Sequence, residues 1–475
     1  MADPVLWTVD ELMTATGGTL HGRVTQPLNG VTIDSRNFAP GDIFAAIKGE
    51  RHDGHDFAAS ALKAGAGLAV VSKVTPEMTA AGPVLEVAED PLRGLENIGR
   101  AARARCHGQI IGITGSVGKT STKEMLRVAL GASGQTHASA ASFNNHWGVP
   151  LTLARMPRET AFGVFEIGMN HAGEITPLVA MVKPQIAIVT TIAASHLGHF
   201  NSLDGIADAK AEIFSGLVPG GHAVICRDTP YFERLANAAR AVGVSSIVSF
   251  GKSPEADVRI ERVALHADCC CITADVLGEK LIYKLGVPGE HMAVNSLAVL
   301  AAVKLGGADL ARAALALATA QPAKGRGVRE RLEIAGGELL LIDESYNANP
   351  ASVAAALALL GHARPARGGR RIAVLGDMLE LGDHGPELHA GLLEPMDAAK
   401  VDVLYAAGPL MTNLWARVPA AKRGAYAAAS GGIRDRLLAG LKAGDVVMVK
   451  GSLGSRMAPL VEAIRAAHPP LVKET

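Results

Sequence analysis

The stretch IIGITGSVGKTSTKEMLRVAL, residues 110–130, joins an apolar strand to a helix through a glycine-rich turn. Successive backbone N–H groups in such a turn, together with the helix N-terminus, form a concave site for an anion. We expect Lys119 to lie against the β- and γ-phosphates of a nucleotide, with the Thr120 hydroxyl available to Mg²⁺. The strict pattern GxxxxGKS/T is not met, because Ile113 occupies the position of its first glycine.

An incidental helix cap is the alternative to nucleotide binding in this turn. The apolar strand before the turn and the helix after it favour nucleotide binding. The residues of the turn that we expect to contact ATP are Thr114, Gly115, Ser116, Gly118, Lys119 and Thr120.

Short apolar strands alternate with helical segments on both sides of this turn, which is typical of a parallel sheet covered by helices. Three β-rich runs between about 246 and 288 (SSIVSF, DVRIERVAL and CCCITADVLG with LIYKLGV) predict an antiparallel patch attached to that sheet. The segment AKGRGVRE, residues 323–330, has the composition of a linker. Four further apolar strands follow it, in GELLLIDES, RRIAVLGDM, VDVLYAAG and GDVVMVKGS, and predict a second doubly wound, Rossmann-like unit.

The length of 475 residues favours two or three domains over a single core. We therefore predict an α/β protein of three domains. These are a small α/β domain at 1–88, a central nucleotide-binding domain with a parallel sheet and antiparallel patch at 89–328, and a Rossmann-like domain at 329–475.

Composition argues against several classes of protein. Apolar residues make up 48% of the chain and charged residues 19%, which suits a globular protein better than a disordered one. Lysine plus arginine and aspartate plus glutamate number 46 each, so bulk charge gives no reason to expect nucleic acid as a partner. No apolar run approaches the ~20 residues of a membrane span, and MADPVLWTVDEL lacks the apolar core of a signal peptide. We expect a cytoplasmic protein, and a monomer.

The five cysteines are odd in number, and three of them are adjacent in a stretch that alternates like a strand. Neither arrangement suits a disulfide framework or the ligand spacing of a zinc site. We expect reduced, structural thiols at Cys106, Cys226, Cys269, Cys270 and Cys271.

Two further apolar strands place polar residues at their ends. Glu166 ends the strand FGVFE, where a carboxylate reaches the Mg²⁺ of a phosphate loop on a neighbouring strand. His196 follows the strand IAIVTTI and is a candidate ligand for a second metal ion or for phosphate. A histidine or an acid at a strand end is by itself more often structural. Because both strands are expected beside the phosphate loop, a functional role is favoured over a structural one for Glu166 and His196.

Several motifs occur together with the phosphate loop along the whole chain. They are TIDSRNFAPGDIFAAIKGERHDGHDF (32–57), SFNNHWGVPLT (142–152), EIGMNHAGEI (166–175), SHLGHF with AKAEIF (195–214), GEHMAVNSLA (289–298), IDESYNANPAS (342–352), LGDMLELG (375–382) and VMVKGS (447–452). In this combination the chain resembles the Mur ligases. The resemblance implies ATP and Mg²⁺ as cofactors, UDP-N-acetylmuramoyl-tripeptide and D-alanyl-D-alanine as substrates, and a role in peptidoglycan synthesis. It also implies that 1–88 holds the uridine nucleotide and 329–475 the incoming dipeptide.

The resemblance assigns catalytic roles to Lys119, Glu166, His196 and Lys210. The implied Mg²⁺ ligands are Thr120, Glu166, His196 and Lys210, the last as a lysine that the family carbamylates. Carbamylation replaces a repelled ammonium by a hard oxygen ligand. Without that modification, Lys210 in the helical run GIADAKAEIF would be an ordinary solvated residue.

The remaining implied contacts fall into three groups. For ATP they are Asn295 near the adenine, Arg326 at the phosphates and Asp343 at the ribose. For the nucleotide substrate they are Ser35 and Arg36, with Asn144 and Asn145 at the reacting centre. For the dipeptide they are Asn347 and Asn349. The roles of His199, which stands where the family pattern has glycine, and of Lys450 with Ser452 stay open, as does the third residue of the tripeptide, diaminopimelate or lysine.

The implied reaction activates the terminal carboxylate of the tripeptide as an acyl phosphate, which the amine of the dipeptide then attacks. A sister ligase that adds a different amino acid, or a folate-polyglutamate enzyme, is the nearest alternative. A nucleotide-switched binding protein is the alternative from another class, but it leaves FNNHWGVP and the N-terminal domain unexplained.

Overall fold

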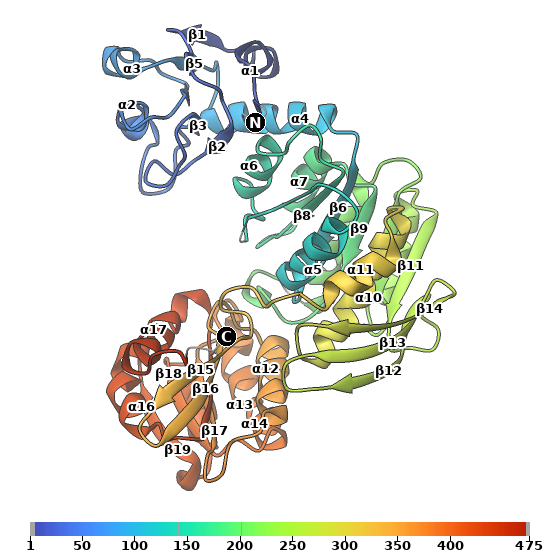
Figure 1. The fold of residues 1–475 in the computed structure, drawn as a ribbon, viewed down its shortest axis with the longest axis vertical. Helices are drawn as coiled ribbons and strands as arrows, with labels where there is room; N and C mark the ends of the chain where they lie inside the picture. Colours follow the sequence, from blue (N-terminus) through green and yellow to red (C-terminus); the bar gives the residue numbers. More distant parts are fainter. Residues whose placement is uncertain (1–4, 141, 201, 472–475) are drawn as a thin grey trace.

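The computed structural model describes residues 5–140, 142–200 and 202–471, and within them the chain forms three β-sheets with helices packed on their faces. Figure 1 shows these sheets as three successive bodies, coloured blue, cyan to yellow, and orange to red along the chain. The predicted α/β class is confirmed: the central sheet is largely parallel, and the first and third sheets are mixed but mostly parallel.

The N-terminal sheet has the strand order β1-β5-β4-β3-β2 and is parallel except for the β1–β5 pair. Its elements are α1 (Val9–Thr16), β1 (Thr19–His21), β2 (Gly30–Thr32), β3 (Asp42–Ala45), α2 (His55–Lys63), β4 (Leu68–Val71), α3 (Pro76–Ala81) and β5 (Val84–Glu86).

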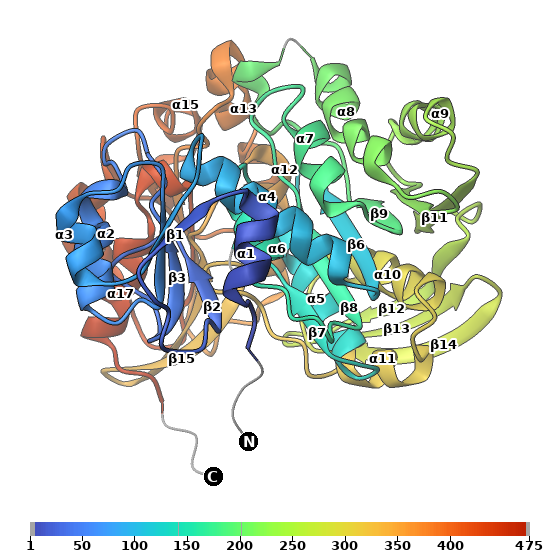
Figure 2. The same ribbon diagram turned by 90° about the horizontal axis from the view of Figure 1, so that it is seen from above.

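Helix α4 (Pro91–Arg105) connects this sheet to the central one and lies between them in Figure 2. Leu95 and Ile98 lie about one turn apart on α4, and both are fully buried. They share a single apolar core with the N-terminal strands and with Leu151 and Ala154 of α6 (Gly148–Ala154). The first two sheets are therefore joined by hydrophobic packing.

The central sheet has the order β14-β13-β12-β11-β10-β9-β6-β8-β7. Its strands are β6 (Gln109–Thr114), β7 (Thr136–Ala138), β8 (Phe162–Glu166), β9 (Ile186–Val189), β10 (His222–Cys226), β11 (Ser246–Gly251), β12 (Val258–Leu265), β13 (Cys270–Val276) and β14 (Glu279–Leu285). The antiparallel patch comprises β12, β13 and β14. Including SSIVSF in it was wrong, because β11 runs parallel to both β10 and β12. Helix α9 (Phe232–Ala241) connects β10 to β11 and returns the chain to the end of the sheet at which β10 begins, as a parallel crossover requires.

Alternate residues of the central strands point to opposite faces. Ile186 and Ile188 of β9 pack under α5 (Lys119–Gly131), α10 (Glu290–Leu305) and α11 (Leu310–Leu317). Ala187 and Val189 pack under α7 (Ile175–Val182), α8 (Leu203–Ala211) and α9 (Phe232–Ala241). The two short 3₁₀ turns η1 (Leu197–His199) and η2 (Glu212–Gly216) flank α8.

The C-terminal sheet has the order β15-β16-β20-β17-β18-β19, and only β15 is antiparallel to its neighbour. Its elements are β15 (Val328–Ile334), β16 (Gly337–Glu344), α12 (Pro350–His362), β17 (Arg371–Gly376), η3 (Gly382–His384), α13 (Gly385–Ala390), α14 (Leu393–Ala398), β18 (Val403–Ala407), α15 (Thr412–Trp415), η4 (Ala420–Lys422), β19 (Arg423–Ala427), η5 (Ser430–Ile433), α16 (Arg434–Gly440), β20 (Val446–Lys450), η6 (Leu453–Ser455) and α17 (Ala458–Ala467). The expected linker is shorter than 323–330, because Val328 already begins β15.

All five cysteines are free thiols, with Cys271 exposed and the other four buried. No helix in the described part of the chain has both the length and the hydrophobicity to cross a membrane.

Candidate active site between the central and C-terminal sheets

A cavity of about 670 Å³ lies where the central and C-terminal sheets face each other. The glycine-rich turn after β6, the end of β8 and the loop after β9 contribute from the central sheet. The loop between β16 and α12 contributes from the C-terminal sheet, as does Lys450 at the end of β20. The carboxyl ends of parallel strands from two different sheets thus converge on one space, which is where α/β folds bind ligands.

The glycine-rich turn depends on two glycines with backbone conformations that favour glycine. Gly115 has φ 145° and Gly118 has φ 89°. A Cβ on Gly115 would lie 1.9 Å from Oγ1 of Thr190, and one on Gly118 would lie 2.6 Å from Nδ2 of Asn295. Side chains are therefore excluded from both positions, and the turn opens directly into α5.

Lys119 is the first residue of α5 and lines the cavity. Its Nζ donates to the carbonyl oxygen of Gly115 at 2.6 Å, so the ammonium folds back over the turn. Burial lowers the pKa of Lys119; the carboxylate of Glu166 opposes this shift and the guanidinium of Arg326 adds to it. A phosphate group in the cavity would bring a negative charge close to the buried ammonium of Lys119 and so stabilise its charged form.

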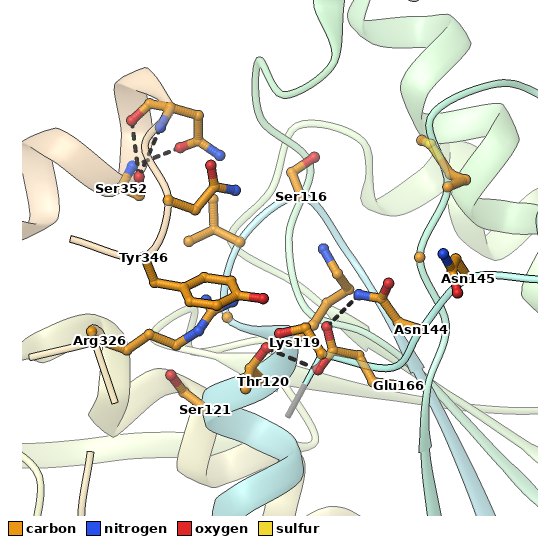
Figure 3. Close-up of a pocket in the computed structure, with 18 of the residues that line it drawn as sticks. Ser116, Lys119, Thr120, Ser121, Asn144, Asn145, Glu166, Arg326, Tyr346 and Ser352 are labelled. Carbon is orange, nitrogen blue, oxygen red and sulfur yellow. Dashed lines mark hydrogen bonds between the residues drawn. The ribbon is translucent and has the colours of Figure 1, made fainter. Parts of the chain in front are cut away.

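Glu166 ends β8, the strand beside β6, and is buried. Its two carboxylate oxygens accept hydrogen bonds from opposite sides, one from Oγ1 of Thr120 and one from Nδ2 of Asn144, each at 2.8 Å (Figure 3). The carboxylate and the hydroxyl are hard oxygen donors held side by side at the phosphate loop. This donor set fits a divalent cation such as Mg²⁺.

The other two residues expected to bind metal, His196 and Lys210, make no hydrogen bond to Thr120 or Glu166 in the described structure. His196 lines the cavity, and its Nδ1 lies 2.5 Å from Oε2 of Glu380. Lys210 is buried in α8 and does not line the cavity, and its side-chain amine makes no hydrogen bond or ion pair with other described residues. Burial lowers the pKa of Lys210 well below its usual value; nearby Lys119 adds to this and Glu212 opposes it.

Among the three expected ATP contacts outside the glycine-rich turn, Arg326 lines the cavity, whereas Asn295 and Asp343 do not. Asn295 is buried in α10 beside Gly118. The guanidinium of Arg326 lies 4.5 Å from the ring centroid of Tyr346, and both residues line the cavity. The Asp343 carboxylate accepts a hydrogen bond from Ser345 at 2.6 Å and another from Arg465 at 3.2 Å, which occupy both of its oxygens.

Two of the four candidate asparagines hold local structure as well as lining the cavity. Oδ1 of Asn145 accepts from the backbone N–H of Gly148, the first residue of α6, at 2.9 Å. Asn349 is the N-cap of α12 and accepts from the N–H of Ser352 at 2.8 Å. Only the Asn144 side chain reaches Glu166. The backbone carbonyl oxygen of Asn347 accepts a hydrogen bond from Nζ of Lys450 at 3.0 Å.

Lys450 is buried, and its Nζ also donates to Oε2 of Glu344 at 3.1 Å. The neighbouring His291 of α10 lines the cavity. Burial lowers the pKa of His291, while Glu344 opposes that shift and Lys450 adds to it.

Ser35 and Arg36 do not line this cavity but lie in the N-terminal body, between β2 and β3. Arg36 is exposed and pairs with Asp34 through two hydrogen bonds of 2.9 Å. Hydrogen bonds from Arg36 lower the pKa of Asp34 to about 2. The ring of His199 lies against that of His171, with centroids 4.6 Å apart and the planes tilted by 54°, and neither residue lines the cavity.

Comparison with known proteins assigns the family. Residues 27–103 match "Mur ligase family, catalytic domain", residues 113–303 match "Mur ligase middle domain", and residues 330–453 match "Mur ligase, glutamate ligase domain". The UDP-N-acetylmuramoyl-tripeptide–D-alanyl-D-alanine ligase of Escherichia coli K12 is 34% identical over 402 residues, which cover 84% of this chain and 86% of that protein. The chain belongs to the Mur ligase family.

Solved structures place this Mur ligase in the same fold. A crystal structure of MurF from Acinetobacter baumannii superposes with a TM-score of 0.84 at 30% identity and covers 97% of this chain and 99% of that one. The MurF ligase of Thermotoga maritima, solved in complex with ADP, has a TM-score of 0.76 at 24% identity, which concerns the fold alone, and covers 93% and 98% of the two chains.

Sequence reasoning missed two residues that line the Mur ligase cavity, Glu344 and Tyr346, and two that lie outside its lining, Glu380 and Lys123. Glu344 and Tyr346 lie inside the motif IDESYNANPAS, and an acid and an aromatic residue shortly before its first asparagine were the available signal. Glu380 lies 184 residues from its partner His196, and no local pattern indicates that contact. Lys123 is fully buried and donates to the carbonyl oxygen of Ser139 at 2.7 Å, although a lysine one turn into a helix suggests a solvated face.

Proposed function

We propose that the chain is an ATP-dependent ligase that joins D-alanyl-D-alanine to UDP-N-acetylmuramoyl-tripeptide and so forms the nucleotide pentapeptide of peptidoglycan synthesis. Relatives named for this activity in Escherichia coli and in Mycobacterium tuberculosis H37Rv, the latter 33% identical over 94% of this chain, support the assignment. We assign residues 1–88 to the uridine nucleotide through Ser35 and Arg36, residues 89–328 to ATP, and residues 329–475 to the dipeptide.

One observation carries the proposal. The phosphate loop and Glu166 on the central sheet face the loop 344–349 of the C-terminal sheet across a single cavity. ATP on the side of the phosphate loop and the amine of the dipeptide on the side of the C-terminal sheet can therefore both reach the carboxylate of the tripeptide between them. A protein that only hydrolyses ATP needs no such second wall, whereas a ligase does.

The first step transfers the γ-phosphoryl group of ATP to the terminal carboxylate of the tripeptide. A carboxylate oxygen bonds to the γ-phosphorus, the bond to the bridging oxygen breaks, and ADP leaves. Lys119 and Arg326 stabilise the charge on the phosphoryl oxygens. Thr120 and Glu166 would hold Mg²⁺, which neutralises phosphate charge when bound.

In the second step the amine of the dipeptide attacks the acyl carbon, and inorganic phosphate leaves from the tetrahedral intermediate. Asn347 and Asn349 lie on the acceptor side of the cavity, and Asn144 lies on the donor side beside Glu166. Closure of the cavity by the C-terminal sheet would protect the acyl phosphate from water.

We further infer that Lys210 acts as a carbamate and joins His196 at a second Mg²⁺ position. The buried, unpaired state of its amine supports this, because a lowered pKa leaves the neutral amine that CO₂ modifies. Intact-mass measurement of native protein in bicarbonate tests the adduct, and Lys210→Ala is its control. We also propose that the protein acts as a monomer, which sedimentation would check.

Phosphate release from ATP tests the proposed function, with the nucleotide tripeptide present and the dipeptide either added or omitted. We expect release to require both substrates and the product mass to be that of the nucleotide pentapeptide. Lys119→Ala should lower kcat/KM by at least 100-fold, because it removes a charge at the transferred phosphoryl group. Release without the dipeptide would favour the nucleotide switch, and release restored by a single amino acid would favour a sister ligase.

A further inference from the structure

Two short loops from different sheets touch at the edge of the cavity. One follows β9 and contains His196 and η1, and the other follows β17 and contains Glu380 and η3. The backbone N–H of Gly198 donates to the carbonyl oxygen of Glu380 at 2.8 Å. The Glu380 side chain returns to the first loop, where its Oε2 lies 2.5 Å from Nδ1 of His196. One residue of the C-terminal body thus makes two hydrogen bonds to the central body.

Both residues of this pair, His196 and Glu380, have an unfavourable backbone conformation. His196 has φ 57° and Glu380 has φ 65°, in the left-handed region that residues with a side chain rarely adopt. Only six non-glycine residues in the described ranges have positive φ, and two of them meet here. Such conformations persist where surrounding contacts hold them, and they concentrate at functional sites.

The loops also approach each other backbone to backbone. A Cβ on Gly198 would lie 3.0 Å from the nitrogen of Gly382, and a Cβ on Gly382 would lie 3.0 Å from Cα of Gly198. The absence of side chains at both positions permits the hydrogen bond between Gly198 and Glu380. The two glycines therefore allow the backbones of the two loops to lie in direct contact.

The second loop is tied to the acceptor side of the cavity. The N–H of Leu379 donates to Oγ of Ser452 at 2.9 Å, and the same hydroxyl donates to the carbonyl oxygen of Ala348 at 3.2 Å. Ala348 lies between Asn347 and Asn349 in the loop that faces the phosphate site. The position of that loop is thus coupled mechanically to the position of Glu380.

We propose that Glu380 is a positioning residue that orients His196 only when the C-terminal body is seated against the central sheet. A carboxylate on Nδ1 fixes the tautomer and the direction of the imidazole, and leaves Nε2 for the cavity. Seating the acceptor loop and orienting His196 then become one event, so the phosphoryl donor is used only when the acceptor side is in place. This inference rests on the proposed ligase reaction.

Three variants test the contact. Glu380→Gln weakens the hydrogen bond to His196. Glu380→Gly deletes the carboxylate while favouring the observed backbone conformation, so the loop should stay folded. Glu387→Gln is the matched control, because Glu387 is an exposed carboxylate of α13 with no hydrogen bond or ion pair in the described structure. We expect both Glu380 variants to lower kcat by about tenfold or more, with the KM for ATP unchanged.

A second readout is independent of catalysis. Spin labels on the exposed Cys271 and on a cysteine introduced by Arg436→Cys would report the distance between the central and C-terminal bodies. The Glu380 variants should broaden this distance distribution, and Glu387→Gln should not. Unchanged kcat and an unchanged distribution in both Glu380 variants would overturn the proposal. Loss of dipeptide-dependent ligation in the unmodified protein would instead overturn the proposed function, whatever the distances show.

Discussion

At the scale of single residues, the buried thiols make stability depend on alkaline pH. Burial raises the pKa of Cys226 and of Cys270 from 9.0 to about 11. Between those pH values the unfolded chain has lost the thiol protons and the folded protein still holds them, so the free energy of unfolding falls as pH rises. The loss is on the order of 2 kcal/mol per thiol, and is complete above pH 11.

Denaturant titrations at pH 8 and pH 10.5 measure this dependence. Cys226→Ala should lower stability at pH 8 through lost packing, yet show a smaller further loss at pH 10.5 than the unmodified protein. An equal or larger loss in the variant would argue against ionisation of Cys226 as a cause.

At the scale of secondary-structure elements, variants of Asn349 can distinguish its role in capping α12 from a role in binding the dipeptide. Its side chain and that of Ser352 form a capping box at the start of α12. Asn349→Ala should lower the free energy of unfolding by about 1 kcal/mol, and Asn349→Asp should preserve it, because aspartate caps equally well. If Asn349 also contacts the dipeptide, the aspartate variant should raise the KM for D-alanyl-D-alanine while keeping the melting temperature. Equal kinetics in Asn349→Asp and the unmodified protein would leave Asn349 as a cap alone.

Elements with continuous apolar runs were predictable from sequence, and elements without them were not. The strands that carry Thr114, Glu166 and Lys450 are buried along their length, so their runs are apolar and their ends are marked. The first three residues of β15 fell within the predicted linker 323–330, because that segment is rich in glycine, lysine and arginine; charged residues at the start of this strand suit a sheet edge. The direction of β11 depends on the crossover through α9 and not on its own residues.

The residues of the site likewise divide into those that a local sequence pattern predicts and those that it does not. The phosphate loop and Glu166 belong to neighbouring strands of one sheet, and the alternation of strands and helices implies that proximity. Glu380 acts across two sheets, and no periodicity within either one describes how they face each other. Lys123 is buried through its contact with Ser139, which depends on the path of the chain after β7.

At the scale of the whole molecule, the three sheets are not joined equally. The N-terminal and central bodies share one hydrophobic core. Trp7 contributes to this core, and its Nε1 donates a hydrogen bond to the carbonyl oxygen of Ala154 at 2.8 Å. The guanidinium of Arg105 lies over the Trp7 ring, 3.6 Å from the ring centroid. The two apolar clusters of the C-terminal body consist of its own residues, with Leu388 alone also packing on the central body.

We therefore expect two thermal transitions, one for the N-terminal and central bodies together and one for the C-terminal body. Trp7→Ala should lower the free energy of the first transition by about 3–5 kcal/mol, because it removes a fully buried aromatic side chain. It should leave the second transition in place, since Trp7 lies in a core that the C-terminal body does not share. Differential scanning calorimetry resolves the two transitions, and Trp7→Phe, which keeps the ring packing but loses the Nε1 hydrogen bond, should give a smaller shift of the first. A single transition that moves as a whole in Trp7→Ala would mean that contacts at the active-site cavity, including the pair His196 and Glu380, couple all three bodies into one cooperative unit.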